Sequence, residues 1–284
     1  MAFSRIYLEI TNCCDLACSF CHGTRRAPAF LTVPQFTALA EALRGHTRFL
    51  YFHVMGEPLL HPDLPAFLRI AGEMGFRVIL TTNGTHLPQC QSALLASPTL
   101  HKLSLSLHSF EANSGTDMAA YLRGCTAFGL TAAAQGVLID YRLWNLDGAA
   151  TRGANLQNDA ILSHLHAAYP GEWIKNTWGW RLCDRTFLHY GERFDWPDSA
   201  APDRGAAGGC RALRDQIAVL CDGTVVPCCL DADGAIPLGN LFSQPLDEIL
   251  SSDAAQSLRT GFQRQTRLHP LCRTCGYADR FRKF

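Results

Sequence analysis

The chain has 284 residues, its 25 Lys and Arg residues balance 25 Asp and Glu residues, and 48% of it is hydrophobic. This length allows one large domain and a small one, with a sizeable buried core. A formal net charge of zero gives no reason to expect a nucleic acid or an acidic membrane as partner. The sequence has no apolar run of bilayer length and no signal-peptide pattern, so we expect a cytoplasmic protein.

Strand-like and helix-like segments alternate over the first two thirds of the chain. Thr32 and Gln35 form a capping-box pattern ahead of one helix, and the next should begin after Asp63, with Pro65 in its first turn and Gly75 at its end. Strands are expected at residues 6–11, 49–54, 77–82, 102–107, 136–143 and 173–180. Six strand–helix units are fewer than the eight of a closed barrel. The pattern therefore predicts an α/β fold with a partial (β/α)6 TIM-like barrel.

A change in composition divides the chain near residue 200. Residues 196–209 are rich in Pro, Gly and Ala, which is typical of a linker, and a cysteine-rich segment follows them. We therefore predict a barrel over residues 1–195, a linker over 196–209 and a small C-terminal domain over 210–284.

The 13 cysteines are grouped rather than spread along the chain, which in a reducing compartment is typical of metal sites. Cys14, Cys18 and Cys21 follow the first strand with the spacing C-x3-C-x2-C. Three thiolates on one loop can bind three irons of a [4Fe–4S] cube and leave the fourth iron open to a small molecule. Cys13 is adjacent to Cys14, so we expect its side chain to point elsewhere.

With Phe20 before the third cysteine, this loop resembles that of the radical S-adenosylmethionine (SAM) superfamily. The resemblance implies that SAM binds the open iron and is cleaved to a 5′-deoxyadenosyl radical, which abstracts hydrogen from a substrate C–H bond. It also implies that Gly56, Glu57 and Pro58, after the second strand, bind the SAM amino group through a backbone edge or the carboxylate. Asn83, after the third strand, should lie near SAM.

Further SAM contacts are expected on the fourth and fifth strands. Ser104 and Ser106 alternate onto one face and, if that face lines the barrel, can donate to the ribose or the carboxylate of SAM. Leu138 is a candidate wall for the adenine ring. Arg142 suits a bidentate contact to a carboxylate of SAM or of the substrate.

A second group of cysteines occupies the C-terminal segment, and four of them stand out: Cys210, Cys228, Cys272 and Cys275. Two such pairs can also form a zinc ribbon. The spacing, with Gly223 ahead of Cys228, resembles the SPASM/twitch region, which implies an auxiliary [4Fe–4S] cluster held by these four residues. Cys221 and Cys229 are the alternative ligands. Only nine residues follow Cys275 and none is cysteine, so we expect the short twitch form with one cluster.

The resemblance leaves the outcome of the radical reaction open. Electron transfer to a fully ligated auxiliary cluster would give net oxidation, whereas return of a hydrogen atom would give epimerisation and needs a donor, for which Cys183 and Cys221 are candidates. His53 and His108 are possible bases, but each is explained equally well as a structural histidine. The leading hypothesis is a radical SAM oxidoreductase or epimerase acting on a sugar-like alcohol or a peptide residue, with a flavodoxin- or ferredoxin-type electron donor.

Two other hypotheses are weighed against this one. A peptide-crosslinking enzyme of the same superfamily is the first, although no leader-binding segment is evident before Arg5. A non-catalytic metal-binding module is the second, and it leaves both residues 56–58 and the three-cysteine count unexplained.

Overall fold

The structure, a computed structural model, describes residues 2–113, 115–145 and 157–281. Within these residues the strands, in chain order, are β1 (Arg5–Leu8), β2 (Phe49–Tyr51), β3 (Arg77–Thr82), β4 (Leu100–Ser106), β5 (Leu138–Leu143), β6 (Ile174–Asn176), β7 (Gly179–Cys183), β8 (Thr186–Tyr190), β9 (Gln216–Val219), β10 (Thr224–Val226) and β11 (Gly239–Asn240). The helices are α1 (Val33–Ala42), α2 (Leu64–Glu73), α3 (Leu87–Leu95), α4 (Met118–Ala134), α5 (Asn158–Ala168), α6 (Leu246–Ser251), α7 (Asp253–Gln263) and α8 (Pro270–Thr274). Short 3-10 helices cover Pro58–Leu60, Leu107–Ala112 and Gly276–Phe281.

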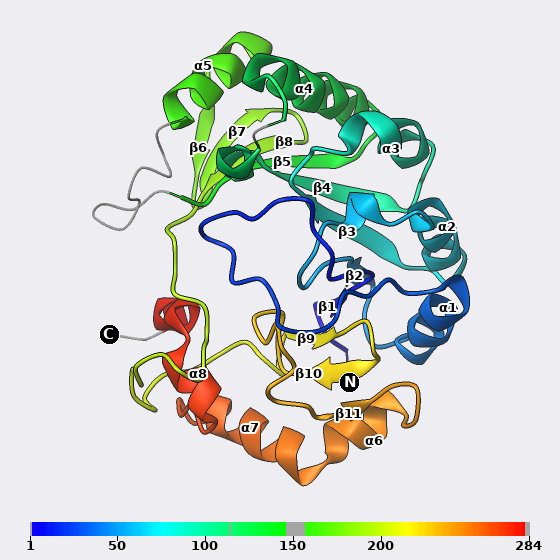
Figure 1. The fold of residues 1–284 in the computed structure, drawn as a ribbon, viewed down its shortest axis with the longest axis vertical. Coiled ribbons are helices and arrows are strands. Elements are labelled where there is room, and N and C mark those ends of the chain that lie inside the picture. Colours follow the sequence, from blue (N-terminus) through cyan, green and yellow to red (C-terminus); the bar gives the residue numbers. More distant parts are fainter. Residues whose placement is uncertain (1, 114, 146–156, 282–284) are drawn as a thin grey trace.

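One curved sheet organises the molecule, with the strand order β11-β10-β9-β1-β2-β3-β4-β5-β8-β7-β6 among the described residues. The run β1-β2-β3-β4-β5-β8 is parallel throughout. Figure 1 shows this sheet curving around a central space, with α1 to α5 on its outer side. The predicted α/β fold with a partial barrel is confirmed.

The outer face of the sheet carries the hydrophobic core. Ile6 and Leu8 of β1 and Leu103 and Leu105 of β4 are buried there, because alternate strand residues point toward the helices. The intervening residues point to the inner face, which is the face without helices. Figure 1 shows the loop after β1, in dark blue, running across the space beside that inner face.

The first two helices begin where the sequence predicts. Thr32 caps α1, and both hydrogen bonds of its capping box with Gln35 are present. Helix α2 begins after Asp63 with Pro65 in its first turn. Gly75, just past its end, has a φ of 86°, a left-handed conformation that favours glycine. Both predicted starts are confirmed.

The sixth predicted strand, residues 173–180, is wrong. That segment contains β6 and the start of β7, which pair with each other antiparallel at the edge of the sheet. The sixth parallel strand is β8, which follows a turn at Asp184 and Arg185 and pairs with β5. Residues 173–180 do alternate as a strand does, but alternation along one segment does not encode the direction of pairing.

The cysteine-rich tail continues the same sheet. Strand β9 pairs parallel with β1, and β10 and β11 extend the sheet antiparallel beyond it, with α6 to α8 packed nearby (Figure 1). The predicted linker is hydrogen bonded to its surroundings: Trp196 Nε1 donates to Phe20 O at 3.0 Å, and Gly208 N donates to Gln265 O at 2.8 Å. The domain boundaries at 195/196 and 209/210 stay predictions.

Candidate functional site

The cysteine loop, residues 12–30, joins β1 to α1 and carries Cys14, Cys18 and Cys21. Cys14 and Cys21 are exposed and Cys18 is partly buried. Partial burial raises the pKa of Cys14 to about 11, and burial together with the charges of Cys21 and Cys14 raises the pKa of Cys18 to about 12. The three thiols therefore lie close enough to influence one another, and a metal that binds their thiolates must displace protons.

The base of this loop is held by Asn12 and Thr11. Asn12 Nδ2 donates to Ala27 O at 2.9 Å, and its Oδ1 accepts from Ala29 N at 2.7 Å. The Sγ atom of Cys13 lies in this base, 3.8 Å from Asn12 Oδ1. Cys13 is therefore engaged at the base of the loop, as its position next to Cys14 suggested.

The second predicted element, residues 56–58, lies directly against the cysteine loop. Gly56 has a φ of 77°, and a Cβ atom on it would lie 2.5 Å from Thr11 O and 2.8 Å from Cys13 O. Glu57 N donates to Cys13 O at 2.7 Å, and Pro58 begins the short helix that follows. Only glycine permits this close approach of two backbones.

The Glu57 side chain is buried, and backbone N–H groups donate to both of its carboxylate oxygens. Its two carboxylate oxygens accept from Leu59 N at 2.9 Å and from Asn83 N at 2.7 Å. Burial raises the pKa of Glu57 to about 7, although these hydrogen bonds favour the charged form. Of the two SAM contacts predicted for this segment, the backbone edge is therefore favoured over the carboxylate.

Asn83 connects the end of β3 to the cysteine loop. Its Nδ2 atom donates to Asp15 Oδ1 at 2.8 Å and lies 3.9 Å from Cys14 Sγ. Its backbone oxygen accepts a 2.7 Å hydrogen bond from Tyr121 Oη, which fixes the turn. Residues 56–58 thus lie against Cys13 and Asn83 lies beside Cys14, so both adjoin the start of the cysteine loop.

The predicted serines lie on the inner face, but they differ in their surroundings. Ser104 Oγ donates to Asp140 Oδ2 at 3.2 Å, and Asp140 also pairs with Lys102 at 2.9 Å and His189 at 2.6 Å. Ser104 is therefore engaged in a polar network of the barrel interior. Ser106, two residues further along β4, lies nearer the edge where the cysteine loop begins.

Two residues predicted for the site lie at the other end of the strands. Leu138 is the first residue of β5, and Cys183 is the last residue of β7, paired with Thr186 at the start of β8. Parallel strands place their carboxyl ends at one edge, and the cysteine loop begins at that edge. Leu138 and Cys183 lie at the opposite edge, so their positions do not favour the roles of adenine wall and hydrogen donor.

Arg142 lies near the carboxyl end of β5 and stacks on Trp144, with its guanidinium carbon 3.6 Å from the ring centroid. Its Nε atom is buried and has no hydrogen-bond partner among the described residues, and the same is true of His53 Nδ1. Burial, and then the charge of Arg142, lowers the pKa of His53 to about 3. The guanidinium of Arg142 thus lies on the Trp144 ring beside a neutral imidazole, with only its Nε atom left without a hydrogen bond.

His108 is held by the same strand. Its Nδ1 atom lies 2.9 Å from Arg142 O, and its ring packs on Phe20 with centroids 4.5 Å apart. Burial lowers the pKa of His108 to about 3, so the ring is neutral at pH 7. Phe20 thereby links the cysteine loop to the inner face, and His108 serves as a structural contact for it.

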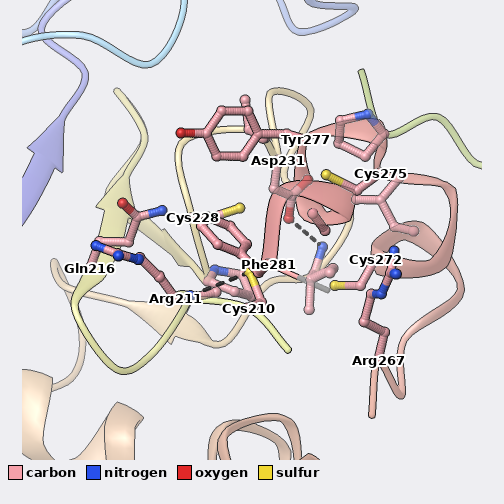
Figure 2. A pocket seen from close by; sticks show the side chains of 17 residues that line it. Cys210, Arg211, Gln216, Cys228, Asp231, Arg267, Cys272, Cys275, Tyr277 and Phe281 are labelled. Atoms are coloured by element: carbon pink, nitrogen blue, oxygen red, sulfur yellow. Dashed lines mark hydrogen bonds between the residues drawn. The ribbon is translucent and has the colours of Figure 1, made fainter. Parts of the chain in front are cut away.

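The tail brings four cysteines around one cavity, which we call the tail cavity. It is lined by Cys210, Cys228, Cys272 and Cys275. Figure 2 shows their sulfur atoms on different sides of its centre. Buried apolar side chains fill the gaps between the thiols: Ala212, Ile236, Leu271 and Ala278. These are the four cysteines that the resemblance implies as ligands.

The alternative ligands face elsewhere. Cys221 Sγ lies 3.3 Å from Glu9 O, at the junction of β9 and β1, and does not line the tail cavity. Cys229 packs with Tyr7 and Tyr51 on the inner face of the barrel, and its thiol forms a hydrogen bond with Tyr7. Adjacent Cys228 and Cys229 thus point to two different spaces.

The donor set of the tail cavity fits an iron–sulfur cube. The fully buried side chain of Arg267 also lines the cavity, and its Nε and Nη1 atoms have no hydrogen-bond partner within the described chain. A buried cation facing four thiols fits an anionic cluster.

The two cysteine sites are joined by direct contacts. Thr24 Oγ1 donates to Asp233 Oδ1 at 2.8 Å, and Arg26 Nε donates to Ala232 O at 2.8 Å. The cysteine loop therefore packs on the segment that follows Cys228 and Cys229.

No helix within the described ranges is long and apolar enough to cross a bilayer.

Comparison with known proteins agrees with this geometry. Residues 8–126 match the family model of the radical SAM superfamily, and residues 210–276 match SPASM, an iron–sulfur cluster-binding domain. The PqqA peptide cyclase of Streptomyces rochei is 28% identical over 304 aligned residues, which cover 94% of this chain and 80% of that protein. An AdoMet-dependent heme synthase of Oleidesulfovibrio alaskensis is 26% identical over 102 aligned residues. These residues cover 35% of this chain and 26% of the heme synthase, so the match spans about a quarter of that protein.

Solved structures share the fold at low identity. BtrN in complex with AdoMet and 2-DOIA superimposes with a TM-score of 0.54 and 18% identity, over 97% of this chain and 93% of that one. SuiB of Streptococcus suis bound to S-adenosylmethionine gives a TM-score of 0.64 and 15% identity, over 91% and 68%. Residues 8–126 thus form a radical SAM domain and residues 210–276 a SPASM domain, which together use SAM, a SAM-binding [4Fe–4S] cluster and an auxiliary one.

Proposed function

We propose that this protein is a radical SAM oxidoreductase that removes two hydrogens from its substrate, a sugar-like alcohol or a residue of a peptide. The observation that carries the proposal is the pairing of an exposed three-cysteine loop with a partly buried four-cysteine cavity, in direct contact through residues 24–26 and 232–233. When bound, the first cluster with SAM supplies the 5′-deoxyadenosyl radical, and the second can accept an electron.

Each site residue has a role in this proposal. Cys14, Cys18 and Cys21 hold the SAM-binding cluster, and Cys210, Cys228, Cys272 and Cys275 hold the auxiliary one. The backbone of Gly56 orients the SAM amino group, Asn83 fixes the loop at Cys14, and Arg142 binds a carboxylate of SAM or of the substrate. Ser106 is a second contact for SAM.

The inner face of the barrel forms the reaction chamber. Tyr7 and His53 pack edge to face there, with ring centroids 5.2 Å apart, and exclude water from the space beside Arg142. His53 is neutral at pH 7 because burial lowers its pKa to about 3. Its Nδ1 atom is buried, so the ring contributes an uncharged wall beside the substrate.

We further propose that the enzyme works in the cytoplasm with a flavodoxin- or ferredoxin-type electron donor. All 13 cysteines are free thiols, which suits a reducing compartment. The exposed positions of Cys14 and Cys21 suit delivery of an electron from a protein at the surface.

The test begins with anaerobic reconstitution, iron and sulfide analysis, and EPR of the reduced protein with and without SAM. Two cubes predict about eight irons per chain and one SAM-sensitive signal beside a SAM-insensitive one. Aminocyclitols, polyols and short peptides are then screened by mass spectrometry for loss of two hydrogens with formation of 5′-deoxyadenosine. A product whose mass is unchanged in H2O and one unit higher in D2O would contradict oxidation and indicate epimerisation.

A second candidate, peptide crosslinking, is favoured by the similarity to the PqqA peptide cyclase over 94% of this chain. Crosslinking also removes two hydrogens, so the mass change alone does not distinguish it. Tandem mass spectrometry does, because a crosslinked peptide yields no fragments from within the ring, whereas a dehydrogenated residue leaves the backbone fragments in place.

A further inference from the structure

Arg267 is the largest fully buried side chain of the described residues, with 0% exposure. It lies between α7 and α8 and has two partners: Nη2 donates to Ala207 O at 2.9 Å and lies 3.4 Å from Asp279 Oδ1. Its Nε and Nη1 atoms are enclosed without a hydrogen-bond partner in the described chain. Two unsatisfied N–H groups on a buried cation are costly unless something negative faces them.

The carboxylate beside Arg267 does not balance its charge alone. Asp279 also pairs at 3.1 Å with Arg204, which has a second carboxylate partner in Asp195, and the Asp279 side chain is 32% exposed. A partly solvated carboxylate therefore offsets the charge of Arg267, and it does so only at the Nη2 atom.

That charge acts on the cavity. Arg267 lines it together with the four cysteines, and Figure 2 shows it on the side where Cys272 lies. A buried guanidinium with two unpartnered N–H groups at this wall favours negative charge in the cavity, such as that of an iron–sulfur cluster.

We propose that Arg267 is the buried counter-charge of the auxiliary cluster and keeps its reduction potential high enough to accept an electron from the substrate radical, whose second hydrogen leaves to solvent as a proton. This inference builds on the proposed ligand set and on the proposed oxidation. The reduced cluster carries one more negative charge than the oxidised one, so a fixed cation and its N–H donors stabilise the reduced form more. Net charge and hydrogen bonds to sulfur are the terms by which a protein sets such potentials.

Arg211 provides the matched comparison. It lines the same cavity, but its side chain is 52% exposed and pairs with Asp215 at 3.7 Å. Water screens an exposed charge far more than a buried one. Both arginines carry the same charge, so a difference between them reports burial and direct donation.

The experiment is a redox titration of the reconstituted holoenzyme, followed by EPR of the SAM-insensitive signal, for wild type, R267Q, R267K and R211Q. We expect R267Q to lower the ratio of reduced to oxidised auxiliary cluster at least tenfold at a fixed potential. For one electron this corresponds to a fall of about 59 mV in the midpoint potential. R267K should shift it less, because it keeps the charge, and R211Q should leave it unchanged.

Each other outcome contradicts the inference. An unchanged potential in R267Q with full iron content overturns it, as does an equal shift in R211Q. If R267Q does not retain the cluster, R267K is the deciding variant. Loss of the cluster in R267K as well would show that Arg267 acts through its packing against Ala207 and not through its charge. Because the titration needs no substrate, it stands apart from a failure of the proposed oxidation. Retention of all irons in Cys272→Ala would instead refute the ligand set.

Discussion

The two cysteine sites of this chain differ in how they are built. The cysteine loop presents three thiols, two of them exposed, on a segment held mainly by backbone hydrogen bonds and by the close approach of Gly56. The tail cavity presents four thiols among apolar side chains, with a buried arginine at its wall. An incomplete ligand set leaves room for a small molecule to bind iron, whereas a complete and enclosed set suits a centre that exchanges electrons only.

The sharpest test of this contrast removes one thiol from each site. Alanine at Cys14, Cys18 or Cys21 should reduce SAM cleavage to background, because the cluster that binds SAM loses a ligand. Alanine at Cys272 should spare uncoupled SAM cleavage and block product formation. Both are measured as 5′-deoxyadenosine and product by chromatography after reduction with dithionite.

Retained turnover in either variant would contradict the corresponding assignment. A Cys90→Ala variant is the control, since Cys90 lies on α3 outside both sites and its thiol contacts Leu59 O at 3.4 Å. It should keep both activities.

The adjacent residues Cys228 and Cys229 test which thiols belong to the tail cavity. Cys228→Ser should lose the auxiliary cluster, so that iron falls from about eight to about four per chain. Cys229→Ser should keep all irons, because its side chain faces Tyr7 on the inner face instead. Iron analysis with EPR checks both, and equal iron loss in the two variants would reverse the assignment.

A smaller effect on SAM cleavage and stability is expected for Gly56, whose backbone contacts the cysteine loop. Gly56→Ala forces a left-handed φ of 77° on alanine, which costs about 1–3 kcal/mol, and adds a collision at 2.5 Å with Thr11 O. Gly75→Ala is the matched control, since its φ is 86° and no atom lies within 4 Å of the added carbon. Urea unfolding and SAM cleavage are measured for both.

Only Gly56→Ala should impair SAM cleavage in addition to stability. If the two variants lose the same stability and neither loses activity, the approach of residues 56–58 to the cysteine loop has no part in binding SAM.

The smallest effect concerns pH. Burial lowers the pKa of His53 from 6.5 to about 3, so the unfolded chain binds a proton that the folded chain does not. Stability is therefore complete above pH 6.5 and falls as the pH drops below it, by about 2 kcal/mol for this histidine between pH 6.5 and pH 5. His53→Gln should reduce this acid sensitivity in urea unfolding, and the exposed His166→Gln should not. Equal pH dependence in wild type and His53→Gln would show that the imidazole is not held neutral.

The sequence predicts local motifs well, because their chemistry is local. The capping box at Thr32 and the turn after α2 appear where they were expected. Cys14, residues 56–58 and Asn83 converge because parallel strands bring their carboxyl ends to one edge. The four tail cysteines meet at one cavity although more than 60 residues separate Cys210 from Cys275.

What the sequence did not predict depends on distant pairing. The direction of β6 and β7 is decided by their neighbours, and the place of Leu138 and Cys183 follows from which end of a strand they occupy. Arg267 shows no pattern in the sequence that separates it from a surface arginine. Its role appears only when residues 207, 272 and 279 are brought around it.

The pairing of β9 with β1 has a consequence for how the chain can be divided. Strand β1 has β2 on one side and β9 on the other, so four registered residue pairs bind the tail to the strand that carries the cysteine loop. Removal of residues 210–284 would leave β1 as a bare sheet edge, a surface that templates aggregation. We therefore expect a barrel cut away from its tail to be prone to aggregation.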